Sequence, residues 1–284
     1  PMRRVIIAVV SDTHGGHRLG LLNPNTVVYA ENEFGEWDYF RPELTESQRF
    51  LWERYMDWMG QVFDFAAGDD LILIHNGDET QGKKYVDQLV STRLADQIVI
   101  ARDNLNPWYA YGNLIAVRIV AGTAAHSFAE GSSAILVREQ LALNHPQVNT
   151  SVLYHGLLSI NGLIVDYAHH GPGPGSRNWL HGNVARFYLR DLMQREIMAG
   201  RRPPGLVLRA HFHVPVYEYL ETGGWKSHFY ITPAMCMMGE HGIQATRSVE
   251  EITVGILALE VVDGEIQRDM RLYQTLDIRT KETL

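Results

Sequence analysis

The 284-residue sequence has a single cysteine, Cys236, so the chain cannot form an internal disulfide bond. This cysteine usage is compatible with a reducing cytosol, and we expect a cytoplasmic protein. No apolar run approaches the ~20 residues that a membrane-spanning helix needs, so no membrane partner is expected. The apolar run behind Arg3-Arg4 ends at Ser11-Asp12, which favours a strand over a signal peptide.

Positive charge is also scarce, because 25 Lys and Arg stand against 33 Asp and Glu, a net charge of −8. No global basic field attracts nucleic acid, although a local patch such as Arg201-Arg202 is compatible with binding it. The sequence has no internal repeat, low-complexity segment or clear linker. Its length allows one large core, and we predict a single domain over residues 1–284.

The sequence does have apolar runs of strand length, each followed by Asp or His. The five runs are Val5–Val10, Leu71–Ile74, Leu114–Val120, Leu163–Ala168 and Leu206–Ala210. They precede Asp12-Thr13-His14, Gly77-Asp78, Gly122 to His126, His169-His170-Gly171 and His211-Phe212-His213, respectively. In open α/β sheets, ligands bind at the C-terminal edge of the strands. Oxygen and nitrogen donors meeting at that edge predict a site for one or two divalent metals.

Helical patterns alternate with these runs in the first two thirds of the chain, which predicts an α/β sheet core flanked by helices. A capping box at Thr45-Glu46-Ser47-Gln48 predicts a helix to about Phe65. Further helices are predicted at about residues 85–101, 132–141 and 183–199. Residues 15–45 are polar and aromatic, and we predict a long insertion or lid loop that selects the substrate.

The spacing of the polar residues favours a pair of metals. Asp12 and His14, two residues apart, can hold one metal from the same side, and Asp78 can bridge two metals ~3.5–4 Å apart. His211 and His213 can send one ring to each metal. Mixed Asp and His sets suit Mn, Fe or Zn better than Mg, and we expect Mn. Each motif alone is weak, and it is their order and their position after strands that carry the prediction.

Taken together, these motifs resemble those of the calcineurin-like metallophosphoesterases. The family pattern is Asp-x-His, Gly-Asp, Gly-Asn-His, His and Gly-His-x-His. The resemblance spans roughly residues 5–215, and the strand-rich residues 216–284 fit the second sheet layer of that family. It implies a four-layer α/β/β/α sandwich and a two-metal centre that hydrolyses phosphate mono- or diesters.

By this resemblance, Asp12, His14, Asp78 and His213 hold the first metal. Asp78, His211 and one of His169 and His170 hold the second. The pattern aligns equally well with either histidine of that pair, and the other is expected to support a ligand or face the substrate.

The sequence departs from the family at the third motif. Thr123 stands where the family has Asn, and two alanines separate it from His126. We favour His126 as the general acid that protonates the leaving group; the alternative is that it replaces the Asn as a ligand. The second metal is then expected to bind more loosely, and Thr123 becomes a candidate substrate contact.

Several residues outside these motifs have a candidate role that follows from their chemistry. Amides of the Gly171–Gly175 loop with Arg177 can bind phosphate, although a rigid structural crossing is equally consistent with the composition. We expect His17 and His181 at the surface, and Met235–Met238 in packing under a loop.

The predicted activity is hydrolysis of a phosphate ester by a metal-activated water. A similarity to phosphoesterases of phages and prophages favours a phosphodiesterase or nuclease, with DNA as a candidate substrate. A phosphomonoesterase acting on a nucleotide or a phosphoprotein is the second hypothesis. A metal-stabilised binding module without catalysis is the third.

Overall fold

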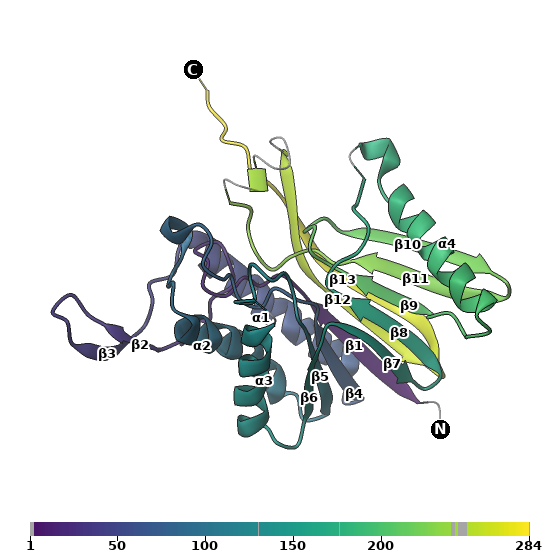
Figure 1. Cartoon of the computed structure of the whole chain (residues 1–284), viewed down its shortest axis with the longest axis horizontal. Helices are drawn as coiled ribbons and strands as arrows, with labels where there is room; N and C mark the ends of the chain where they lie inside the picture. Colours follow the sequence, from purple (N-terminus) through teal and green to yellow (C-terminus); the bar gives the residue numbers. More distant parts are fainter. Residues whose placement is uncertain (1–2, 130, 176, 240–241, 244–248, 284) are drawn as a thin grey trace.

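The computed structural model describes residues 3–129, 131–175, 177–239, 242–243 and 249–283, and its fold is mixed α/β, as predicted (Figure 1). Within these residues the strands form two larger sheets and a separate hairpin. The first sheet contains, in order, β13 (Glu265–Asp277), β12 (Glu251–Val262), β1 (Arg4–Val10), β4 (Asp70–His75), β5 (Leu114–Val120) and β6 (Asn149–Leu153). The second contains β10 (Val216–Thr222), β11 (Trp225–Ile231), β9 (Leu206–Arg209), β8 (Leu163–Ala168) and β7 (His155–Ile160).

Strand β1 is apolar from Val5 to Val10, and both of its faces are buried there. Ile6 and Ala8 point into a core shared with helices α1 (Glu46–Ala66), α2 (Leu94–Leu105) and α3 (Ser132–Asn144). Val5 and Ile7 point to the other side, into a core shared with the second sheet. The two sheets therefore face each other, with α1–α3 outside the first one.

Helix α4 (Asn183–Met198) covers the outer face of the second sheet. Its Leu189 and Met193 are fully buried against Phe229 and Ile231 of β11. In Figure 1 the helix lies over β9–β11, on the side opposite α1–α3.

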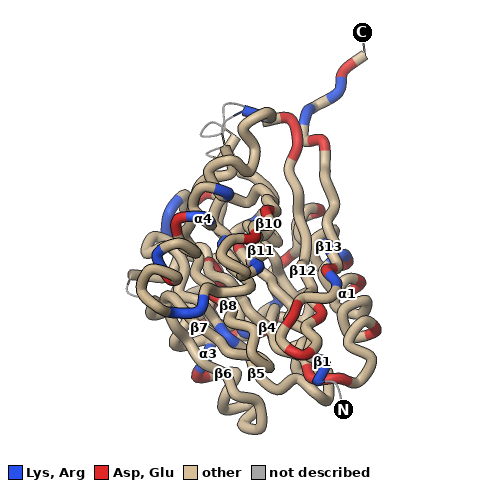
Figure 2. Tube along the Cα trace, turned by 90° about the vertical axis from the view of Figure 1, so that its right-hand side faces the viewer, with Lys and Arg blue, Asp and Glu red and all other residues tan. Residues whose placement is uncertain are grey.

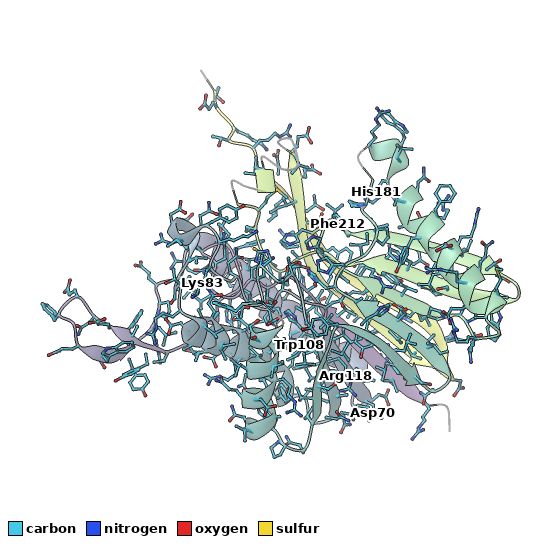
Figure 3. The ribbon with its side chains drawn as sticks, viewed as in Figure 1. Asp70, Lys83, Trp108, Arg118, His181 and Phe212 are labelled. Carbon is cyan, nitrogen blue, oxygen red and sulfur yellow. The ribbon has the colours of Figure 1, made fainter. Side chains whose placement is uncertain are left out.

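Several strands end at the same edge of this arrangement. Strands β1, β4, β5 and β6 are parallel to one another, and β8, β9 and β11 are parallel in the second sheet. Figure 3 shows the two ends of the sheets: Asp70, at the start of β4, lies at one edge, and Phe212, which follows β9, lies at the other. The residues that follow β1, β4, β5, β8 and β9 meet at the second edge.

The expectation that residues 216–284 form one layer is wrong. Strands β10 and β11 belong to the second sheet, but β12 and β13 belong to the first, where β12 pairs antiparallel with β1. The reason is that β12 is apolar on both faces, since Ile256 faces the helices and Leu257 faces the other sheet. Such a strand is stable only in an interior position.

Helix α1 begins as predicted, with the backbone N–H of Gln48 donating to Thr45 Oγ1 at 3.2 Å and that of Thr45 donating to Gln48 Oε1 at 3.0 Å. Helix α2 begins at Leu94, not near residue 85. The preceding segment contains only a short 3-10 helix, η1 (Val86–Gln88), and the buried side chain of Gln97 bonds to the backbone of Gly82 and Ser91 on either side of it.

The segment 15–45 divides into two parts. Residues 15–17 and 20–22 are buried beside the strand ends, whereas β2 (Val28–Glu31) and β3 (Trp37–Phe40) form a hairpin that projects from the body (Figure 1). All four residues of β3 are exposed. Only the hairpin part of this segment therefore projects from the body as an insertion.

In Figure 2, Lys and Arg are interspersed with Asp and Glu along the chain. Of the helices that the structure describes, none combines the length and apolar character that a membrane crossing requires.

Candidate metal centre

The centre lies at the edge where the parallel strands end, and its backbone is unusual. Five of its residues have positive φ angles, although none is glycine. They are Asp12 (50°), His14 (44°), Asp78 (53°), His211 (72°) and His213 (58°). This region is sparsely populated by L-residues, and such strain persists only where the surrounding structure enforces it.

Backbone hydrogen bonds hold the loops after β1 and β4 together. The N–H of Asp12 donates to the carbonyl of Gly77 at 3.0 Å, and the N–H of His14 donates to the carbonyl of Asp78, also at 3.0 Å. The N–H of Asn76 donates to the carbonyl of Val10 at 2.7 Å. The pairing of the two strands therefore continues into the loops and fixes the two carboxylates relative to each other.

One group of donors contains Asp12, His14 and His213. The Nε2 atom of His213 lies 3.1 Å from Asp12 Oδ1, and that of His14 lies 3.9 Å from the same oxygen. The two Nε2 atoms are 3.3 Å apart. Asp12 is fully buried; burial favours its neutral form, yet His213 and His169 hold the pKa of its carboxyl well below the usual range.

A second group contains Asp12, Asp78 and His169. The Nε2 atom of His169 lies 3.1 Å from Asp78 Oδ2 and 3.9 Å from Asp12 Oδ1. Its Nδ1 donates to the carbonyl of Asn76 at 2.7 Å, which turns Nε2 toward the carboxylates. Burial opposes protonation of His169, but Asp12 and Asp78 outweigh it and raise the pKa of the imidazole to about 9.

Two buried carboxylates so close together require compensating positive charge. In this structure the imidazoles of His169 and His213 each lie 3.1 Å from one of these carboxylates, which raise the pKa of both rings despite their burial. A divalent cation can supply the positive charge in their place, which frees the two Nε2 atoms to act as ligands. The donor set, a mixture of carboxylate and imidazole, therefore fits a metal ion.

Three imidazoles form a further group, comprising His169, His170 and His211. The hydroxyl of Thr123 lies between them, 3.4 Å from His169 Nε2, 3.5 Å from His170 Nε2 and 3.2 Å from His211 Nδ1. Thr123 also donates to Asp78, from its backbone N–H at 2.6 Å and from its hydroxyl at 3.2 Å. Both members of the pair His169 and His170 thus reach the centre.

His126 also lies in the centre. Its ring is 4.7 Å from that of His14, and it forms a group with His14 and Asp78 in which the donor atoms lie within 4.8 Å of one another. Its Nδ1 donates to the carbonyl of Gln81 at 2.7 Å, so Nε2 is its remaining nitrogen. This geometry is compatible with both roles that the sequence leaves open, general acid and ligand.

Arg177 stands apart from these groups. It is exposed, and its guanidinium lies 5.3 Å from the ring centroid of exposed Trp179. Among the described residues, Arg177 has no interaction with the carboxylates or imidazoles of the centre. The loop before it is constrained instead by packing, because a Cβ atom on Gly171 would overlap the side chain of buried Arg209.

A pocket of about 230 Å³ opens beside the centre, and the sequence did not predict most of its walls. His17, expected at the surface, is buried; its Nε2 donates to Gln88 Oε1 at 3.2 Å and its Nδ1 accepts from the N–H of Leu19 at 2.9 Å. Cys236 and Met237 line the same pocket, in addition to their predicted packing role. Sequence periodicity gives no signal for such residues, because they lie in loops. His181 is exposed, as predicted.

Gly77→Ala tests the packing around His169. Gly77 has a φ of +101°, and a Cβ atom there would overlap the His169 ring. We expect the free energy of unfolding to fall by about 1–3 kcal/mol and manganese affinity to fall at least about tenfold. Urea denaturation and calorimetric titration measure these effects. Gly60→Ala in α1 is the control, since a Cβ atom there meets nothing within 4 Å; an equal loss in that variant would contradict the explanation.

No protein-family model matches the chain, and no curated protein matches it. The solution NMR structure of the Thermotoga maritima protein TM1076 is 12% identical, with a TM-score of 0.34 over 97% of this chain and 99% of that one. The Thermus thermophilus sulfate thiohydrolase SoxB, in complex with glycerol, is 11% identical, with a TM-score of 0.38 over 98% of this chain and 57% of that one. The Aquifex aeolicus protein AQ665, of unknown function, is 12% identical, with a TM-score of 0.30 over 73% of this chain and 78% of that one. Similarity this low supports no statement about family or activity.

Proposed function

We propose that this protein is a cytoplasmic, metal-dependent phosphoesterase, a phosphodiesterase or nuclease for which DNA is a candidate substrate. We also propose the four-layer α/β/β/α architecture of the calcineurin-like metallophosphoesterases. One observation carries the proposal: the buried carboxylates Asp12 and Asp78 and the imidazoles of His14, His169, His211 and His213 meet at one edge of the sheets. Their donor groups overlap, since Asp12, His14, Asp78 and His169 each belong to two of them. Overlapping groups suit two adjacent cations.

The residues of the centre would have different roles. Asp12, His14 and His213 would hold one cation, His169 and His211 the other, and Asp78 would bridge them. When bound, two divalent cations polarise a phosphoryl oxygen and lower the pKa of a water molecule. Asp78 is oriented by the N–H of Thr123, which fixes Oδ1 at 2.6 Å. His126, whose Nδ1 donates to Gln81, can present a proton on Nε2 to the leaving oxygen.

Turnover of two artificial esters with added Mn²⁺ tests this proposal. Hydrolysis of bis(p-nitrophenyl) phosphate supports a diesterase, whereas hydrolysis of p-nitrophenyl phosphate alone supports a phosphomonoesterase. Absence of both activities in metal-loaded protein would contradict the enzymatic proposal and favour a metal-stabilised binding module. The binding-module hypothesis is based on Thr123, which stands where the family has a metal-binding Asn.

The role of His126 predicts a dependence on the leaving group. We expect His126→Ala to lower turnover of a phenyl phosphodiester about 10²–10³-fold, because phenolate leaves poorly without a proton. Turnover of the nitrophenyl diester should fall much less, since nitrophenolate needs little protonation. Steady-state kinetics on both esters provide the measurement. An equal loss on both, together with reduced metal content, would identify His126 as a ligand instead.

A further inference from the structure

The hydroxyl of Thr123 is surrounded by more polar atoms than it can hydrogen-bond. Its Oγ1 atom lies within 3.5 Å of one carboxylate oxygen, on Asp78, and of nitrogen atoms from His169, His170 and His211. A hydroxyl donates one hydrogen bond and has two acceptor lone pairs. Four partners at this separation exceed its capacity, so the hydroxyl alone does not explain why the three imidazoles converge here.

The three imidazoles also lie close to one another. The rings of His169 and His170 have centroids 4.9 Å apart, and those of His170 and His211 are 4.7 Å apart. A ring nitrogen of each lies within 3.5 Å of the Thr123 hydroxyl, so the three rings face one region. One cation bound in that region can accept a nitrogen from each ring.

The nitrogens that face this point are defined by their other contacts. His169 offers Nε2, because its Nδ1 donates to the carbonyl of Asn76. His170 and His211 offer the atoms nearest to Thr123, which are Nε2 and Nδ1, respectively. One ring nitrogen from each of the three residues lies within 4.8 Å of the others. Zinc–nitrogen bonds are about 2.0–2.1 Å long, so binding of all three rings to one zinc ion requires these nitrogens to approach to within about 4.2 Å of one another.

We infer that His169, His170 and His211 together bind one cation, with His170 replacing the amide oxygen that Thr123 cannot supply, so that this position selects zinc over manganese. Three imidazoles form a borderline-soft donor set that favours zinc, iron or copper, whereas manganese prefers oxygen ligands. The neighbouring group of Asp12, His14 and His213, with the shared Asp78 beside it, contains carboxylates and would therefore accept manganese. The two positions therefore differ in metal preference.

This inference rests on the metal centre of the proposed function but not on its catalytic activity, so metal binding alone tests it. Metal-free protein is titrated with Zn²⁺, and separately with Mn²⁺, against a chromophoric chelator. We expect two equivalents of zinc to bind, and the second equivalent of manganese to bind at least about tenfold more weakly than the first. In His170→Ala we expect the affinity for one zinc equivalent to fall at least about tenfold, with the other unchanged.

His181→Ala is the matched control, because His181 is an exposed histidine on the loop that follows (Figure 3). Circular dichroism checks that each variant is folded. Anomalous diffraction from a zinc-soaked crystal gives a second readout, with a peak expected at bonding distance from His170 Nε2. Unchanged zinc affinity in His170→Ala, or a zinc peak that His170 does not contact, would overturn the inference. Two zinc equivalents with the expected His170→Ala effect but no ester hydrolysis would support it and refute only the phosphoesterase proposal.

Discussion

Asp78→Asn is expected to lower turnover of bis(p-nitrophenyl) phosphate by at least about a thousandfold. The Asp78 carboxylate is buried, accepts two hydrogen bonds from Thr123 and lies 3.1 Å from His169 Nε2. Asn has nearly the same shape but lacks the charge that a bridging ligand supplies. Because the side chain is replaced by one of similar size, we expect the fold to persist while metal content falls.

Asp70→Asn is the matched control for this prediction. Asp70 lies on the same strand, β4, but it is exposed at the opposite edge of the sheet (Figure 3). Turnover, metal content by plasma emission and circular dichroism are measured for both variants. Wild-type turnover in Asp78→Asn would refute the bridging role, and so would an equal loss in Asp70→Asn.

Arg209→Ala is expected to reduce the free energy of unfolding by about 3–5 kcal/mol. Arg209 is buried, with Nη1 2.7 Å from Asp166 Oδ1 and Nη2 donating to the Tyr188 hydroxyl at 2.8 Å. Removing the guanidinium leaves the buried Asp166 carboxylate without the cation beside it, and His155 Nε2 at 2.9 Å remains as its contact. The loss of side-chain volume beside Gly171 also removes the support of the loop after His170.

Urea denaturation of the wild type and two variants measures this effect. The comparison is Arg195→Ala, which removes an ion pair with Asp191 of similar length, 3.0 Å, but in which both side chains are 65% exposed. Exposed pairs contribute at most about 1 kcal/mol. If both variants lose the same stability, burial does not determine the contribution of Arg209.

The parts of the structure that the sequence predicted are those with a local signal. Each apolar run became a strand because a strand buried on both faces needs no polar residue, and the polar residues after it then had to lie at its end. The convergence of Asp12, Asp78 and His169 follows from parallel strands ending at one edge. The capping box at Thr45 is likewise a local motif.

The parts that the sequence did not predict depend on long-range contacts. Pairing of β12 with β1 joins residues about 250 positions apart, and no pattern within β12 specifies its partner. The start of α2 is set by Gln97, whose side chain holds the loop at Gly82 and Ser91. The buried His17 ring contacts Gln88, which lies 71 positions further along the chain. Periodicity along the chain contains none of this information.

The backbone bonds between the loops after β1 and β4 have a consequence for metal uptake. Because Asp12 and His14 are tied to Gly77 and Asp78 before any ion arrives, little conformational freedom remains to be lost on loading. Ligands from these loops should therefore exchange one ion for another without rearrangement of the main chain. Differences in affinity among metals would then report the coordination chemistry of the side chains rather than the reorganisation energy of the polypeptide.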